Sequence, residues 1–213
     1  MRATWLLLFL LILVGNARET AAQVADLAGV LTGDRWVYEV KDEITGDLKQ
    51  TVSIVVLDVS EKEINTRFSS RGTERPHQIV FDQTWNRIDD SVWKYQPTDG
   101  TGIQSPLQVG KEWRFENMAS NFQNGTAMRT TGHSKVAGQE KITTSAGTFD
   151  TFKIEIVMRQ VNSNDQTKAA SVNMTLWYAP VVNRWVRKTY TLQVEGRLRD
   201  SHTEELTDYS RKP

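Results

Sequence analysis

The chain is dominated by short stretches in which apolar and polar residues alternate. The clearest runs from Phe152 to Met158, where every second residue is apolar and Lys153 and Glu155 stand between apolar neighbours. A period of two is that of a β-strand with one buried face. Gly147 precedes this stretch and permits a sharp turn that other residues resist. A turn followed by an alternating strand is the unit that recurs along the sequence.

Repetition of this unit predicts the fold class. Turn residues such as Thr45-Gly46-Asp47 and Asn124-Gly125 separate the alternating stretches, and we count about ten short strands. Short strands with a turn every 8–12 residues or so are typical of an all-β sandwich or barrel. No sustained helical pattern is visible in the mature chain. Residues 23–32 are expected to form a leader or a short helix, and residues 33–200 a single antiparallel β domain.

Three polar segments interrupt the strand pattern. Residues 97–110 hold two prolines and three glycines, too many breaks for a strand, so they are expected to form a loop between two halves of one sheet. Residues 86–90 read as a polar turn. Residues 201–213 are highly charged and are predicted to be a tail that frays or forms an edge strand.

The first 22 residues have the anatomy of a secretory signal peptide. A positive start at Arg2 precedes an apolar run from Trp5 to Val14, and small residues follow up to Ala22. The run is short for a membrane-spanning helix, which needs about 20 apolar residues, although an uncleaved anchor is the alternative. Cleavage could follow Ala17 or Ala22, and we favour Ala22. The protein is therefore expected to be exported, and to be periplasmic or secreted.

Charge and cysteine content exclude several classes of function. The chain has 26 basic and 26 acidic residues among 213, so it has no global field that would attract nucleic acid, and no nucleic-acid partner is expected. It has no cysteine, which excludes disulfides, thiol nucleophiles and thiolate metal sites. No glycine-rich phosphate loop is present, and no cofactor is expected.

No catalytic or metal-binding group is expected. The histidines, His77, His133 and His202, are far apart in the sequence. Asp89-Asp90 and Glu204-Glu205 are adjacent pairs, and neighbours on a strand point to opposite faces, so neither pair forms a facing acid–base couple. We interpret them as a solvated turn and a solvated tail.

The aromatic and large apolar residues are the most informative set. They fill sheet cores, or they line an apolar cavity with a few polar groups, and the sequence leaves both alternatives open. On the apolar faces of their strands we predict eight residues that share one inward face and are candidate ligand-binding residues: Trp36, Tyr38, Phe68, Phe152, Ile154, Met174, Tyr178 and Tyr190.

Three segments carry a resemblance to a known family. The segments Gly147-Thr148-Phe149-Asp150-Thr151-Phe152-Lys153-Ile154, Trp177-Tyr178-Ala179-Pro180 with the residues up to Arg187, and Gly33-Asp34-Arg35-Trp36 resemble an uncharacterised family of bacterial cell-envelope, periplasmic β domains. That family is distantly similar to the LolA/LolB-like lipoprotein carriers and receptors. The resemblance implies one strongly curved antiparallel sheet, an incomplete barrel with an apolar concave face. The family pattern has glycine near Asn183, and asparagine tolerates the left-handed conformation better than most residues.

These observations support several functional hypotheses. The leading one is a non-enzymatic periplasmic binding module that holds a lipid, a lipoprotein or another apolar or amphiphilic ligand on the concave face. The second is a cell-envelope interaction or assembly factor with a protein partner and no small ligand. A hydrolase is the least favoured. A small outer-membrane barrel also has alternating strands, but Lys188 interrupts its apolar face, and the chain lacks a terminal aromatic residue.

Overall fold

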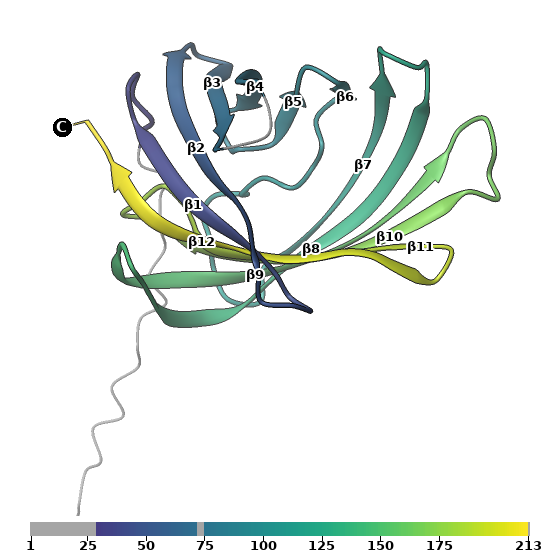
Figure 1. Cartoon of the computed structure of the whole chain (residues 1–213). Coiled ribbons are helices and arrows are strands. Elements are labelled where there is room, and N and C mark those ends of the chain that lie inside the picture. The colour runs from purple at the N-terminus through teal and green to yellow at the C-terminus, as the bar shows by residue number, and fades with distance from the viewer. Residues whose placement is uncertain (1–28, 72–74, 213) are drawn as a thin grey trace, which may run out of the picture.

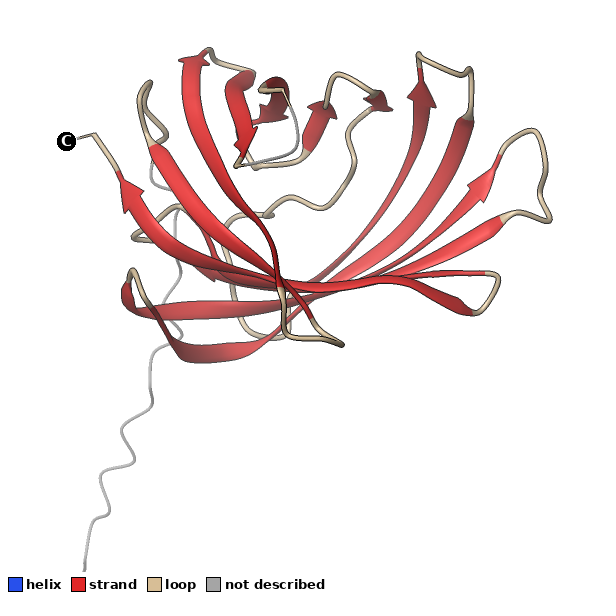
Figure 2. Cartoon of the chain, viewed as in Figure 1, coloured by secondary structure: helices blue, strands red, loops and turns tan. Residues whose placement is uncertain are grey.

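The computed structural model of the chain describes residues 29–71 and 75–212, and it shows a closed β-barrel (Figures 1 and 2). Each strand pairs antiparallel with the next, and the last pairs with the first. The twelve strands are β1 (Arg35–Asp42), β2 (Leu48–Val59), β3 (Glu63–Ser70), β4 (His77–Asp82), β5 (Arg87–Asp89), β6 (Trp93–Gln96), β7 (Glu112–Asn121), β8 (Ala127–Thr144), β9 (Gly147–Asn162), β10 (Ala169–Ala179), β11 (Arg184–Val194) and β12 (Arg197–Ser210).

The prediction of an all-β antiparallel fold is confirmed. Within residues 29–71 and 75–212 every regular element is a strand, so this part of the chain contains no helix that could cross a membrane. The predicted signal peptide, residues 1–22, and most of the predicted leader, residues 23–32, lie outside the described residues.

The predicted incomplete barrel is wrong, because the C-terminal segment closes it. Strand β12 pairs with β1 from Arg35↔Ser210 to Asp42↔His202, and with β11 on its other side. Residues 201–210 are therefore part of a barrel strand that is paired on both sides, instead of a frayed tail or an edge strand, and the domain extends beyond residue 200. The charge of this segment is compatible with a strand because Leu206 is fully buried and the inward-facing Glu204 has an ionic partner, Lys188.

Two further differences concern single strands. The predicted polar turn at residues 86–90 contains the short strand β5, which adds one strand to the predicted pattern. The residues on both sides of Gly138 belong to one long strand, β8, which has an irregularity in its register between Val136 and Gly138. An interrupted apolar pattern at such a bulge reads in the sequence as the end of a strand.

The up-and-down strand order divides the connections between two ends of the barrel. We call the end that carries the β1–β2, β3–β4, β5–β6, β7–β8, β9–β10 and β11–β12 connections the mouth end, and the opposite end the base end. The β7–β8 connection contains Asn124-Gly125, with Gly125 at a φ of 71°, so the predicted hairpin is confirmed. The chain enters β1 and leaves β12 at the base end.

An aromatic core fills the base end. The rings of Trp36 and Trp85 meet edge to face at 5.5 Å, and Trp36 Nε1 donates a hydrogen bond of 3.1 Å to the carbonyl of Val182. Asn183 adopts a positive φ of 53°, as its tolerance of this conformation predicts. Its Oδ1 accepts hydrogen bonds from Tyr178 Oη (2.8 Å) and Trp85 Nε1 (3.3 Å).

The long loop between β6 and β7 lies inside the barrel (tan in Figure 2). Ile103 and Leu107 are 1% and 0% exposed and belong to the core formed with β8, β9 and β10. The loop is tied to the barrel wall, because the side chain of Asn117 donates a hydrogen bond of 2.9 Å to the carbonyl of Asp99. The prolines and glycines of residues 97–110 predicted a loop between two halves of the sheet. This loop is present, and it fills part of the barrel interior.

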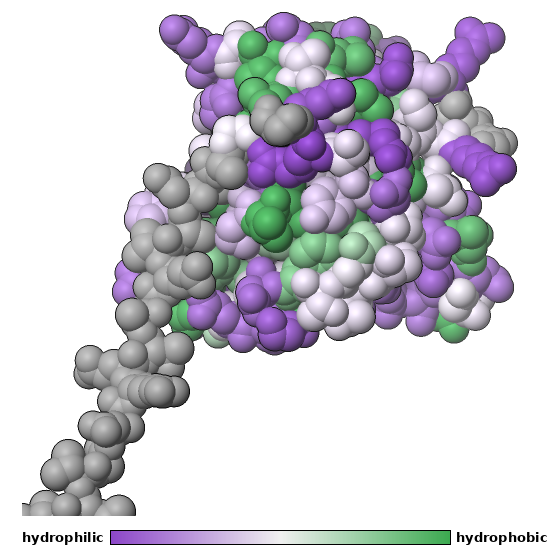
Figure 3. All heavy atoms as spheres, turned by 90° about the vertical axis from the view of Figure 1, so that its left-hand side faces the viewer, coloured by the Kyte–Doolittle hydropathy of each residue, from purple (hydrophilic) through white to green (hydrophobic). Residues whose placement is uncertain are grey.

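The outer surface is polar with scattered apolar residues. Ile44, Phe122 and Val181 are 72%, 66% and 65% exposed, and they lie in three different connections, two at the mouth end and one at the base end. On the face shown in Figure 3, hydrophobic residues form separate groups among hydrophilic ones. Isolated exposed apolar residues are common on soluble proteins.

One glycine in β8 makes room for the interior packing. A Cβ on Gly132 would lie 2.0 Å from the Phe115 ring, whereas a Cβ on Gly138, in the same strand, would meet nothing within 4 Å. We expect Gly132→Ala to lower the free energy of unfolding by about 1–3 kcal/mol, the usual cost of overpacking. Gly138→Ala should leave it unchanged or raise it slightly. Urea denaturation of both variants measures the difference, and similar effects would contradict the packing of Phe115 over Gly132.

Candidate ligand-binding cavity

The barrel encloses a cavity of about 930 Å³ that reaches the mouth end. Its lining includes Arg75 from the β3–β4 connection, Ser91 and Val92 from the β5–β6 connection, and Gln123 from the β7–β8 connection. The base end is filled by the aromatic core. Ligand pockets usually have about 300–1,000 Å³ and mix apolar walls with a few polar groups, so this cavity has an appropriate size for a small molecule.

Apolar side chains from both halves of the barrel form the cavity wall. Phe68 and Phe81 come from β3 and β4, and Met158, Val172 and Met174 come from β9 and β10. They point inward because each lies on the buried, alternate positions of its strand. A flexible apolar chain could lie between these two walls.

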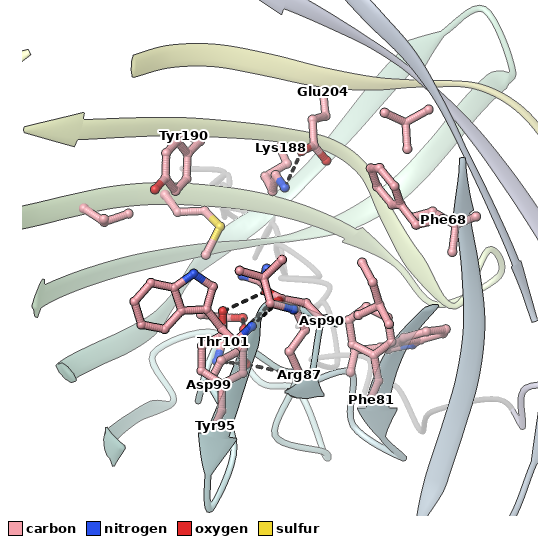
Figure 4. A pocket seen from close by; sticks show the side chains of 18 of the residues that line it. Phe68, Phe81, Arg87, Asp90, Tyr95, Asp99, Thr101, Lys188, Tyr190 and Glu204 are labelled. Carbon is pink, nitrogen blue, oxygen red and sulfur yellow. Dashed lines mark hydrogen bonds and ion pairs between the residues drawn. The ribbon is translucent and has the colours of Figure 1, made fainter. Parts of the chain in front are cut away.

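One ionic cluster stands on one side of the cavity (Figure 4). Arg87 Nε lies 3.0 Å from Asp99 Oδ2, and Arg87 Nη1 lies 3.5 Å from Asp90 Oδ2. Asp99 also accepts hydrogen bonds from Thr101, which fixes the start of the interior loop. Tyr95 donates to Asp90 over 3.0 Å, and burial raises the pKa of the Tyr95 hydroxyl above its ordinary value. Both carboxylates of this cluster are thus occupied by donors.

A second ionic cluster stands on the opposite side, on β11 and β12 (Figure 4). Lys188 Nζ and Glu204 Oε1 are 2.5 Å apart, and His202 Nε2 lies 3.7 Å from the same oxygen. The ring of Tyr190 stacks on His202 with the centroids 5.0 Å apart. Burial disfavours ionisation of Glu204, but Lys188 and His202 outweigh burial and lower the pKa of Glu204 to about 2. The Glu204 carboxylate is therefore ionised at neutral pH.

Arg184, at the start of β11, lies where the cavity meets the aromatic core. It is 1% exposed and also lines the cavity. Its guanidinium is 4.2 Å from the ring centroid of Trp85 and 4.1 Å from that of Trp185. Burial lowers the pKa of Arg184 below its ordinary value. The side chain is a buried cation held chiefly by aromatic faces.

The structure divides the eight predicted binding residues into two groups. Phe68, Met174 and Tyr190 line the cavity. The other five are packed in the two cores: Trp36, Tyr38, Phe152, Ile154 and Tyr178.

Three of these core residues have a structural role. Trp36 and Tyr178 bind the β10–β11 turn through their polar atoms, and Tyr38 donates a hydrogen bond of 2.9 Å to the carbonyl of Trp185. Strand alternation shows which face is inward, but it does not show how deep along the barrel axis a residue lies.

The sequence reasoning missed the charged residues of the cavity, which are Arg75, Arg87, Asp90, Asp99, Arg184, Lys188 and Glu204. Of the two acidic pairs read as solvated, Asp90 and Glu204 face the cavity, whereas Glu205 lies 3.5 Å from Arg187 on the other face of β12. The expectation that neighbours point to opposite faces therefore holds, but the interpretation of Glu204 as part of a solvated tail is wrong. The one available signal was Lys188, which interrupts the apolar face of its strand.

The histidines lie in three different environments. His77 packs against Phe68 in the cavity with the ring centroids 4.9 Å apart, His133 lies 3.4 Å from Glu112 on the outer surface, and His202 belongs to the second ionic cluster. Among the described residues, no three His, Asp or Glu side chains are grouped as ligands for a metal ion.

Phe68 and Phe152 should differ in what their truncation costs. Phe152 is 4% exposed in the core, so Phe152→Ala should lower the free energy of unfolding by about 3–5 kcal/mol. Phe68 borders the cavity, so Phe68→Ala should cost less than about 2 kcal/mol and should instead weaken binding of an apolar fluorescent probe. Urea denaturation and a probe titration measure the two effects. Equal losses of stability would show that Phe68 is packed as tightly as Phe152.

The Lys188–Glu204 pair predicts a specific dependence of stability on pH. The lowered pKa means that the Glu204 carboxylate stabilises the fold above its ordinary pKa of 4.5. This contribution is lost as the pH falls from there through about 2. Glu204→Gln should lower the free energy of unfolding at pH 7 by about 2 kcal/mol, less than for a fully buried pair, and should flatten the acid limb of the stability profile.

The double variant Lys188→Met, Glu204→Leu is the control for this prediction. It removes both charges, so no unpaired ammonium remains, and it should recover most of the stability lost in Glu204→Gln. Thermal melts of the three proteins between pH 2 and pH 7 compare them. An unchanged acid limb in Glu204→Gln would contradict the assigned pKa.

Comparisons with known proteins identify the fold. No protein-family model matches the sequence, and no curated protein matches it. A predicted lipoprotein of Parabacteroides distasonis ATCC 8503 is similar in structure, with a TM-score of 0.58 and 14% identity over 88% of this chain and 100% of that one. A predicted exported protein of Bacteroides fragilis NCTC 9343 with a YmcC-like fold has a TM-score of 0.58 and 13% identity, at the same coverage. The chain therefore has a fold like that of these proteins, whereas the resemblance to LolA/LolB-like carriers stays a prediction.

Proposed function

We propose that this protein is a non-enzymatic binding protein of the bacterial cell envelope, which holds an amphiphilic molecule inside its barrel. The observation that carries the proposal is the cavity of about 930 Å³ that reaches the mouth end between two apolar walls. A cavity of this kind, with a few convergent polar groups, is the default candidate for a ligand site.

Placement in the cell envelope rests on two observations. The sequence begins with a positive, apolar and small-residue pattern typical of a secretory signal peptide. The proteins of similar structure include a predicted lipoprotein and a predicted exported protein. Both support export of this chain.

The state of the cavity carboxylates favours binding over catalysis. Asp90 and Asp99 are both paired with Arg87, and Glu204 is paired with Lys188. A general base must be able to take a proton near the operating pH, and the pKa of Glu204, at about 2, is far below that range. These carboxylates are suited to shaping the wall.

The alternative is an envelope assembly factor that binds a protein and no small ligand. It requires a docking surface, whereas the three most exposed of the large apolar residues, Ile44, Phe122 and Val181, lie in three separate connections. The internal cavity is the more distinctive feature, so the small-ligand function is favoured.

A cavity-filling variant tests the proposal. N-phenyl-1-naphthylamine, an uncharged apolar fluorophore, should bind the delipidated protein. Gln160 lines the cavity on β9, so Gln160→Trp should weaken this binding by about tenfold or more, because filling a pocket removes the apolar contacts of the ligand. Val157 lies on the outer face of the same strand and is 54% exposed, so Val157→Trp is the matched control and should bind like the wild type.

Two results would overturn the proposal. Absence of any fluorescence enhancement would show that the cavity takes no apolar molecule, and it would favour the assembly factor. Equal enhancement in Gln160→Trp and Val157→Trp would place the probe on the outer surface. Circular dichroism of both variants confirms that they retain the barrel.

A further inference from the structure

Arg184 is a buried cation with unused hydrogen-bonding capacity. Its Nε and Nη1 are buried and have no hydrogen-bond partner among the described residues, and no carboxylate of that part of the chain lies within 4.0 Å of its guanidinium. A buried charge is costly unless it is paired and hydrogen-bonded. Arg184 is therefore the buried cation of the cavity that a ligand could satisfy.

The surroundings of Arg184 leave only the edge of its guanidinium for a ligand. Trp85 and Trp185 lie over the guanidinium at 4.2 and 4.1 Å, which occupies its faces. The unpartnered donors Nε and Nη1 lie on different edges of the guanidinium, and each shares its edge with Nη2. A carboxylate or phosphate that pairs with either edge would therefore satisfy one of these two donors together with Nη2.

The other charged residues of the cavity wall have ionic partners, apart from the exposed Arg75. Arg87 is paired with Asp90 and Asp99, and Lys188 is paired with Glu204. The charged residues of the lining are Arg75, Arg87, Arg184 and Lys188 against Asp90, Asp99 and Glu204. Four cations minus three anions leave a surplus of one positive charge, and the buried cation without an ionic partner is Arg184.

We propose that the ligand is an anionic amphiphile whose carboxylate or phosphate head group pairs with Arg184 at the inner end of the cavity. The inference rests on the proposed function and names the ligand class for the same cavity. The apolar chain lies along Met158, Val172 and Met174 toward the mouth end. Both unpartnered nitrogens are covered from solvent, so this pairing requires the Arg184 side chain to shift toward the cavity when the head group binds.

Displacement of bound N-phenyl-1-naphthylamine by three ligands with the same alkyl chain tests the head group. Dodecanoate and dodecyl phosphate are anionic, and dodecan-1-ol is neutral. At least one of the two anions should displace the probe at a concentration about tenfold or more below that of dodecan-1-ol, since a hydrogen bond to a charged group is worth at least such a factor. The anion that displaces it at the lower concentration identifies the head group as carboxylate or phosphate.

Substitution of Arg184 tests the residue. Arg184→Met removes the charge and keeps an unbranched side chain, so it should reduce the preference for the anion to about threefold or less while dodecan-1-ol still binds. Arg184→Lys keeps the charge without the fork and should retain part of the preference. Arg67, exposed on the outer face of β3, provides the matched control Arg67→Met, which should keep the full preference.

The outcomes separate this inference from the proposed function. Equal displacement by both anions and dodecan-1-ol in the wild type would overturn the anionic head group and leave the proposed function standing. An anion preference that persists in Arg184→Met would overturn the assignment to Arg184. Failure of the probe and of all three ligands to bind would overturn the proposed function, and this inference with it. If Arg184→Met does not fold, Arg184→Lys tests the residue, and a preference for the anion as large as that of the wild type would overturn the assignment to the Arg184 guanidinium.

Discussion

Pairing of the first strand with the last is the constraint on which the rest of the structure depends. It removes both free edges of the sheet and fixes the number of strands around the axis at twelve. About eight strands give a barrel just wide enough for side chains to fill, so the interior of a twelve-strand barrel is wider than the side chains of its wall can fill. The interior loop carrying Ile103 and Leu107 takes part of that space, the aromatic core takes the base end, and the remainder is the cavity.

Polar groups hold the interior in place as much as apolar contacts do. Asn183 ties the turn between β10 and β11 to Trp85 and Tyr178, and Asp99 ties the interior loop to Arg87 in β5. Asn183 is 2% exposed and Asp99 is 4% exposed. A buried polar group is stable only when its hydrogen bonds are made. The two residues thus fix the geometry of segments that strand pairing does not reach.

The sequence predicted the local structure of strands and turns better than it predicted the closure of the barrel. Alternation identified the inward face of β9 and β10, and the turn residues Gly125 and Asn183 have the positive φ expected of them. Closure was missed because the inward positions of β12 include Glu204, and a charged inward residue resembles a solvated one until its partner Lys188 is known. The charged residues of the cavity wall were missed for the same reason. An ion pair between two strands joins residues that are far apart in the sequence, and the alternation within one strand does not reveal it.

The seam between β1 and β12 also sets the direction in which the protein faces. The start of β1 and the end of β12 both lie at the base end, where the backbone nitrogen of Lys212 donates a hydrogen bond of 2.7 Å to Asp34. A tether or fusion partner joined after Lys212 therefore meets the barrel on the side opposite its opening. A protein held in this way would present the opening to the surrounding medium, so the path into the barrel stays unobstructed.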